Sequence, residues 1–240
     1  SEMCIRDWYI LGLDTCREIR IDSLTEDLNS LEARTIIRQL SAQAVTVLEN
    51  KEEILPFTHL NKKRFGVISV GRQNAQPFVK RLQEYAPIEN VSRLNAQSTD
   101  KEIKGIVDVI SHSTQTIIAI FSDKKEEIQL AEKILKKATG KILVFFTSPY
   151  TIPKYEELTA EADAIIVAYE NNPVMQECAA EVLFGGSSAD GKLPVSTGKY
   201  PQGSGIFIPE CRLGHAFPEE VDMDSRILSR IDSICLLYTS

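Results

Sequence analysis

The chain has 240 residues, 43% of them hydrophobic, which is enough to bury the core of one domain with flanking segments. The net charge of −7 provides no basic surface for nucleic acid or anionic lipid, and no apolar run approaches the roughly 20 residues that span a bilayer. The first residues also lack the basic and apolar regions of a signal peptide. We therefore expect no nucleic-acid partner and no membrane span.

The two ends of the chain differ from the rest. Residues 1–7 and 235–240 break off without a cap or a continuing pattern and resemble translated adapter sequence, so we exclude them from the fold. Residues 8–30 have the pattern of an irregular connector. On this interpretation Cys4 and Cys235 carry no information about the protein.

The remaining cysteines, Cys16, Cys178 and Cys211, form no C-x-x-C pair and have no histidine at metal-binding spacing. We expect no disulfide framework in a chain of this length and no metal site. Cys178 falls within an apolar helix pattern and is expected to be a small core residue.

Helical and strand patterns alternate along the rest of the chain. A long amphipathic helix is predicted over 31–50. Five strand-like runs follow, and all but the second are nearly continuous in apolar residues, as in parallel strands covered on both faces. These runs are 64–70, 88–94, 115–121, 141–147 and 163–169.

The segments between and after these strands have helical spacing of apolar residues. The predicted helices are 75–86, 99–113, 124–140 and 172–186. Thr99 and Glu102 have capping-box spacing, and Gly140 and Gly185 are expected to stop their helices. A sixth, edge strand is predicted at 192–196 because of Pro194.

Strands that alternate with helices in this way form right-handed βαβ units. The predicted fold class is therefore α/β, a three-layer α/β/α sandwich with a mostly parallel six-stranded sheet and flavodoxin-like architecture. Beyond residue 205, prolines and glycines indicate a linker, and a helix predicted at 223–234 would open another domain.

Two short motifs match the signatures of functional sites, but we favour a structural interpretation of each. Residues 186–192 match G-x-x-x-x-G-K, but Leu193 stands where a phosphate-binding loop needs Ser or Thr, and a helix rather than a strand precedes it. We interpret this segment as a helix C-cap and turn. Residues 122–125 match S-x-x-K without the S-D-N or K-T-G partners of serine β-lactamases, so Ser122 is interpreted as the N-cap of the next helix.

The sequence indicates no cofactor. No G-x-G-x-x-G follows the first strand, which argues against a dinucleotide site. His59, His112 and His215 are far apart and belong to no motif, so each is expected to be structural or solvated.

Polar residues follow three of the predicted strands directly. Because the carboxyl ends of parallel strands face the ligand crevice of an open sheet, these residues are our candidates for substrate binding. The alternative, which we weigh equally, is that they are ordinary loop residues and helix N-caps. The candidates are Arg72, Gln73, Tyr150, Glu170, Asn171 and Asn172.

Several segments resemble parts of known protein families. EARTIIRQLSAQAVTVLENKEEILPF (32–57) resembles the glycoside hydrolase family 3 signature in which an A-x-x-A-V-T-L-L-x-N helix leads into L-L-P-L. AAEVLFGGSSADGKLPVS (179–196) resembles the closing motif A-x-V-L-F-G-x-x-x-P-x-G-K-L-P-V-S of that family. The connector at 12–29 is similar to the one that joins barrel and C-terminal domain in the NagZ-like β-N-acetylhexosaminidase branch. Residues 217–234 are similar to the opening of a serine β-lactamase-like domain.

The resemblance implies a division into foreign N-terminal residues with an interdomain connector (1–30), the C-terminal α/β domain (31–205), and a linker with the truncated start of a following domain (206–240). It implies a longer bacterial parent, a periplasmic or secreted β-N-acetylhexosaminidase or β-glucosidase, whose (β/α)8 barrel carries the aspartate nucleophile of a retaining mechanism. The expected partners are that barrel and a carbohydrate substrate.

No catalytic residue is assigned in this chain, which by itself is expected to be inactive. In the β-glucosidase branch an acid/base glutamate comes from the C-terminal domain, but no position here matches it. The alternatives are a stand-alone ligand-binding module of flavodoxin-like architecture and a scaffold for subunit contact.

Overall fold

The computed structural model describes residues 8–12, 21–22, 24–88 and 90–231. The segments interpreted as adapter sequence, together with Cys4, Cys16 and Cys235, lie outside the described residues. Within the described residues, no helix combines the length and the apolar character needed to cross a membrane.

A six-stranded sheet in the order β1-β6-β5-β4-β2-β3 forms the centre of the domain. Neighbouring strands are parallel except for β1, which pairs antiparallel with β6. The predicted α/β sandwich with a mostly parallel six-stranded sheet is therefore confirmed. The strands are β1 (Thr46–Asn50), β2 (Phe65–Val70), β3 (Asn90–Leu94), β4 (Gln115–Ile120), β5 (Lys141–Phe145) and β6 (Ala164–Val167).

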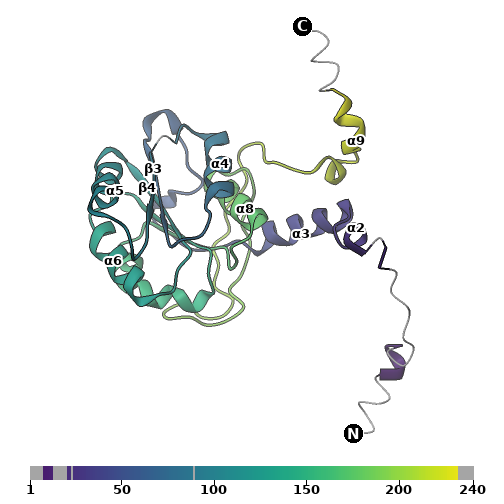
Figure 1. Cartoon of the computed structure of the whole chain (residues 1–240), viewed down its shortest axis with the longest axis horizontal. Helices are drawn as coiled ribbons and strands as arrows, with labels where there is room; N and C mark the ends of the chain where they lie inside the picture. Colours follow the sequence, from purple (N-terminus) through teal and green to yellow (C-terminus); the bar gives the residue numbers. More distant parts are fainter. Residues whose placement is uncertain (1–7, 13–20, 23, 89, 232–240) are drawn as a thin grey trace.

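Helices cover both faces of the sheet (Figure 1). Successive residues of one strand enter different cores, as the two-residue period of a strand requires: Ile117 packs on the side of α4 and α8, and Ile118 on the side of α5, α6 and α7. The helices are α2 (Leu24–Leu28), α3 (Leu31–Ala44), α4 (Gln76–Tyr85), α5 (Asp100–His112), α6 (Lys125–Leu135), α7 (Glu156–Ala160), α8 (Pro173–Phe184) and α9 (Ser225–Leu228). Short 3-10 turns occur at η1 (Lys51–Glu53), η2 (Leu60–Lys62), η3 (Pro149–Tyr155) and η4 (Pro218–Val221).

The sixth strand is not the predicted one. The helix expected over 31–50 ends at Ala44, and the last five residues of the predicted range form β1. Val45 and Val47 are fully buried in the core, and β-branched residues fit a pleated strand better than a helix. The predicted strand at 192–196 is not a strand of the sheet, although Leu193 exchanges backbone hydrogen bonds with residues 203 and 204.

Local capping signals were mostly predicted correctly. The Thr99–Glu102 capping box is present, and Gly185 ends α8 in the left-handed region at φ 73°. Cys178 is fully buried. The helix at 124–140 ends earlier than predicted, at Leu135, and its N-cap is Lys124 rather than Ser122. Ser122 instead accepts a hydrogen bond from the backbone N–H of Lys124 through its Oγ, at 3.2 Å.

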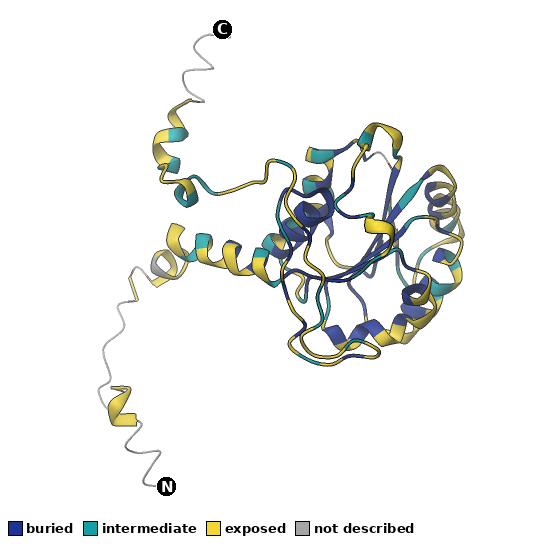
Figure 2. Cartoon of the chain, turned by 180° about the vertical axis from the view of Figure 1, so that it is seen from behind, coloured by how far each residue is buried: buried dark blue, intermediate teal, exposed yellow. Residues whose placement is uncertain are grey.

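The two described ends of the domain leave it on the same side. Figure 2 shows α2 and α3 projecting from the sandwich and the segment with η4 and α9 running beside them. Residues of η4 contact α3. The segment that leads into this end is attached to the domain, because Ile206 and Ile208 form isolated bridges with Val47 and Ala189.

Candidate functional site

The strand order defines one preferred place for a ligand. β2 has β3 on one side and β4 on the other, so the connections from β2 and β4 diverge at their carboxyl ends. Gly71, directly after β2, has a φ of 117°, and a Cβ there would lie 2.6 Å from the side-chain oxygen of Gln73. The same Cβ would lie 3.4 Å from the Cβ of Ser122, so this position requires glycine.

The candidates Arg72 and Gln73 are exposed at this end of β2. Tyr150, in the first turn of η3 after β5, is 60% exposed. Glu170 is also exposed, after β6. All four side chains are therefore accessible at the carboxyl edge of the sheet.

The connection from β6 to α8 begins with a strained residue that the sequence did not reveal. Tyr169 has a φ of 58°, a conformation that costs a side-chain-bearing residue roughly 1–2 kcal/mol. Its hydroxyl lies 2.7 Å from Oγ1 of Thr46, at the start of β1. Burial raises the pKa of Tyr169, so this group is a neutral hydrogen-bonding partner. Such strain is concentrated at functional sites and persists only where the surroundings enforce it.

A buried glutamine connects two of the edge loops. Gln176, in the first turn of α8, donates through Nε2 to Oδ1 of Asn171 at 2.6 Å and to the carbonyl oxygen of Asn74 at 2.9 Å. Its Oε1 accepts from the backbone N–H of Phe78 at 3.1 Å. Gln176 therefore brings Asn171 into contact with the loop that carries Arg72 and Gln73. It was not among the sequence candidates.

Asn172 has the local role that the alternative interpretation predicted. Its Oδ1 accepts the backbone N–H of Met175 at 2.8 Å, which makes it the N-cap of α8. A ligand role is therefore better supported for Glu170 and Tyr150, for whose side chains no hydrogen bond is found within the described part of the protein.

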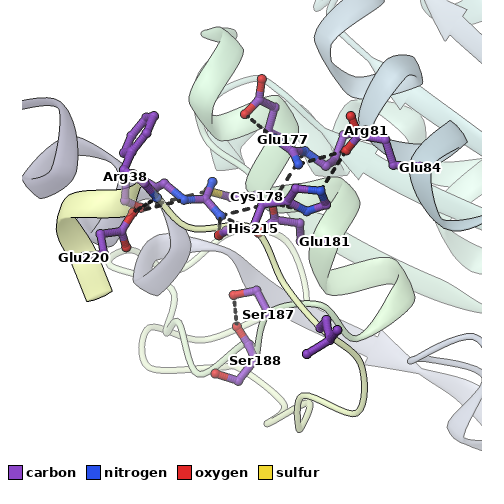
Figure 3. Close-up of polar contacts among 12 residues, drawn as sticks. Arg38, Arg81, Glu84, Glu177, Cys178, Glu181, Ser187, Ser188, His215 and Glu220 are labelled. Carbon is purple, nitrogen blue, oxygen red and sulfur yellow. Dashed lines mark hydrogen bonds and ion pairs between the residues drawn. The ribbon is translucent and has the colours of Figure 1, made fainter. Parts of the chain in front are cut away.

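A second polar group, which we call the Glu181 cluster, lies between α3, α4, α8 and the C-terminal segment (Figure 3). Glu181 is 1% exposed and forms two hydrogen bonds with Nη2 of Arg38, at 2.9 and 3.1 Å. Nε of Arg81 lies 3.5 Å from Glu181. The same guanidinium also pairs with Glu84 and Glu177, each at 2.9 Å. The members of the cluster are Arg38, Arg81, Glu84, Glu177, Glu181, His215 and Glu220.

Arg38 joins both ends of the domain through this cluster. Besides Glu181 it contacts Oε1 of Glu220 at 3.5 Å and donates to the carbonyl oxygen of His215. The ring of His215 lies 3.1 Å from Glu84 and packs edge-on against Tyr85. The cluster therefore holds the C-terminal segment against α4 and α8 at one point and against α3 at another.

Burial dominates the electrostatics of this cluster. Burial raises the pKa of Glu181, and the guanidinium of Arg38 opposes that rise. Burial, followed by Arg81, lowers the pKa of His215, so its ring is neutral at pH 7. Burial also raises the pKa of the Cys178 thiol to about 12, which keeps it protonated and unreactive. These residues stabilise contacts between elements and leave little capacity for a ligand.

The helix α3 is amphipathic in the reverse of the usual sense. Its buried residues are Arg38 and Ser41, whereas Ile36, Ile37 and Leu40 are 47%, 49% and 61% exposed. A surface helix normally turns its apolar stripe to the core. A contiguous apolar stripe that faces outward is typical of a surface that another protein surface covers.

No family model matches the chain, and no curated protein matches it in sequence. Solved structures do share its fold. A glycoside hydrolase family 3 β-N-acetylglucosaminidase from Paenibacillus sp. str. FPU-7 is 18% identical with a TM-score of 0.57, and the match covers 78% of this chain and 36% of that one. A fungal multi-domain GH3 β-N-acetylglucosaminidase is 16% identical with a TM-score of 0.59, over 78% of this chain and 21% of that one.

A β-glucosidase from Listeria innocua is 15% identical with a TM-score of 0.57, over 78% of this chain and 29% of that one. The chain thus spans about a third or less of the enzymes that it resembles. At these identities the likeness shows the fold: the described domain has the fold of a part of family 3 glycosidases.

Proposed function

We propose that this chain is the C-terminal sandwich domain of a retaining, exo-acting β-glycosidase, and that it packs beside a catalytic (β/α)8 barrel and helps to shape the substrate cleft. The observation that carries the proposal is the outward apolar stripe of α3, formed by Ile36, Ile37 and Leu40. A domain that turns three large aliphatic side chains to solvent on one helix is built to be covered.

The two sequence motifs support the same proposal because of where they lie. The motif at 32–57 forms α3, β1 and the turn that follows, so it includes the outward stripe. The motif at 179–196 forms the end of α8 and the loop after it, in which Gly191 lies against the backbone of Val45, directly before β1. Both motifs therefore build the side of the domain from which α3 projects. The shared fold with family 3 glycosidases is consistent with this assignment.

The β-N-acetylhexosaminidase branch is our preferred assignment within the family. It is supported by the resemblance of the connector at 12–29, part of which lies outside the described residues. In this assignment the barrel supplies the nucleophile and the acid/base, and the sandwich supplies contacts at its exposed edge. Glu170 and Tyr150 are the side chains that we expect to face the cleft.

The first test is hydrolysis of p-nitrophenyl N-acetyl-β-glucosaminide and p-nitrophenyl β-glucoside by this chain alone and by the longer protein that contains it. We expect activity in the longer protein and none in the chain alone. The substrate that is hydrolysed faster identifies the branch, either β-N-acetylhexosaminidase or β-glucosidase. Hydrolysis by the chain alone would contradict the assignment of catalysis to a barrel. Absence of activity in the longer protein would favour a ligand-binding module.

A pair of variants tests the docking surface itself. Ile36→Glu in the longer protein is expected to lower kcat/KM several-fold, because a charge in a covered apolar stripe opposes docking. Val107→Glu on α5 is the matched control, since Val107 is 52% exposed but lies on the other face of the sheet. Equal activity of the two variants would show that α3 does not form part of the interface.

A further inference from the structure

The two edges of the sheet differ in what lies beside them. At one edge, Val47 of β1 forms a bridge with Ile206, so the C-terminal segment lies against that strand. At the opposite edge, β3 pairs with β2, and among the described residues no other strand or bridge lies beside it (Figure 1). Three of the five residues of β3 are exposed. β3 is therefore an open edge strand, which is a template for pairing with another chain.

The backbone of β3 turns two residues to this open edge. The carbonyl oxygen of Leu94 accepts the N–H of the residue after β2 at 2.8 Å. The carbonyl oxygen of Ser92 accepts the hydroxyl of Ser69 at 3.4 Å, so Ser92 and Leu94 both face β2. Successive residues of a strand direct their N–H and C=O groups to opposite sides. The backbone groups of Val91 and Arg93 therefore point away from the sheet.

The side chains of the same two residues turn to the face of the sheet that carries α4. Val91 is paired in register with Val67, which belongs to the core under α4 and α8. A groove of ≈420 Å³ lies on this face, and its walls include Val79 of α4, Val91 and Arg93. Val91 is 45% exposed there. An extended chain along β3 would thus meet backbone groups at the edge and side chains in the groove.

The groove has one cation with unused capacity. No hydrogen bond or ion pair of the Arg93 side chain is found in the part of the chain that the structure describes. Glu102 also lines the groove, but its Oε2 accepts from the N–H and the hydroxyl of Thr99, at 2.6 and 3.0 Å, in the capping box of α5. A charged side chain on an edge strand deters unmatched strands. A strand that pairs with β3 therefore needs a carboxylate opposite Arg93 and an apolar side chain opposite Val91.

We propose that β3 and this groove bind an extended acidic segment of a partner protein, which joins the sheet as an additional antiparallel strand. Antiparallel pairing is the more stable arrangement, and the residues opposite Val91 and Arg93 each exchange two hydrogen bonds with them. From its N-terminus, the segment reads as an acidic residue, any residue, and an aliphatic residue. β1 and β3 lie at opposite ends of the sheet, so this site is independent of the proposed function.

The test is binding of a fluorescently labelled peptide to this chain, measured by fluorescence anisotropy. The peptide Lys-Thr-Glu-Thr-Val-Thr-Lys has the required pattern, and we expect it to bind saturably. The same peptide with an N-methyl group on its valine keeps every charge but loses a donor to the edge of β3. It is expected to bind at least about tenfold more weakly.

Variants of the chain test the charge and the edge separately. Arg93→Glu is expected to bind this peptide about tenfold more weakly, and to bind instead a peptide with lysine in place of glutamate. Lys133→Glu on α6 makes the same change of charge at an exposed position and is the matched control, with affinity expected to stay within about twofold of wild type. Val91→Pro removes the N–H that faces the open edge. Proline is tolerated at such positions, so we expect binding to be lost and Tm to stay close to wild type.

The outcomes decide for or against strand addition. A loss in Arg93→Glu that the lysine peptide reverses, together with a loss on N-methylation, supports it. Absence of binding to the wild-type chain at millimolar peptide overturns it, and so does binding that N-methylation leaves unchanged. If the chain without peptide sediments as a dimer that Val91→Pro dissociates, a second copy supplies the strand and the proposal of a partner protein is wrong.

Discussion

Replacement of Arg38 by methionine tests whether the Glu181 cluster holds the domain together. Arg38 and Glu181 are 8% and 1% exposed, and two hydrogen bonds join them. Removal of one partner of a buried pair leaves an uncompensated charge and costs about 3–5 kcal/mol. Arg81 remains 3.5 Å from Glu181, so we expect the lower end, about 3 kcal/mol. For a domain of this size that corresponds to a fall in Tm of roughly 6–12 °C.

The assay is urea unfolding of this chain followed by circular dichroism. The double variant Arg38→Met with Glu181→Leu is expected to recover at least half of the loss, since replacing a buried pair by apolar residues is often neutral. Lys136→Met is the control, because its ion pair with Glu157 is solvent-exposed and its loss should leave the urea midpoint unchanged. Two results would refute a tightly coupled pair. One is a loss of unfolding free energy below about 1 kcal/mol for Arg38→Met, and the other is a double variant whose loss equals the sum of the losses of the two single variants.

Three further predictions concern single positions. Burial lowers the pKa of His215, so the unfolded chain binds a proton more readily; the stability that this residue contributes is complete above its ordinary pKa of 6.5 and is lost as pH falls below it. The difference in urea midpoint between wild type and His215→Gln at pH 7.5 and pH 5 measures this, and a difference independent of pH would contradict it. Glu52 is exposed with a φ of 52°, so Glu52→Gly is expected to stabilise the chain by about 0.5–1 kcal/mol in urea unfolding. The control is Gln129→Gly within α6, which is expected to destabilise the chain by about 1 kcal/mol. A loss of stability for Glu52→Gly would show that the backbone at position 52 is not strained. Asn50→Ala removes two hydrogen bonds of 2.9 Å to the backbone of Leu55 and is expected to cost about 1–2 kcal/mol by the same assay, and an unchanged midpoint would mean that the turn holds without them.

The parallel strands could be predicted because burial on both faces leaves a continuous apolar run. Ile117, Ile118 and Ile120 show this in β4, where successive residues enter opposite cores. β1 was missed because its apolar residues continue the helical spacing of α3. What makes it a strand is antiparallel pairing with β6, far away in the chain, and local propensity carries no information about that partner.

The carboxyl edge of the sheet was located correctly because strand ends can be identified from the sequence. The geometry within it could not be predicted, since the positive φ of Tyr169 and the bridge through Gln176 depend on tertiary packing. The Glu181 cluster did leave a signal. Glu181 is a charged residue inside the apolar run AAEVLF of a buried helix, and such a residue requires a partner of opposite charge.

The pairing of β1 has a consequence for the order of events during synthesis. Thr46 pairs with Val167, so roughly 120 further residues, or about 6–24 s of translation, separate the emergence of β1 from that of its partner strand. Val47 also bridges Ile206, which emerges later still. During this interval the segment 31–50 has no sheet to join, and the apolar residues of α3 and β1 stay exposed. A nascent chain of this protein therefore exposes the apolar residues of β1 before the sheet that buries them has been synthesised.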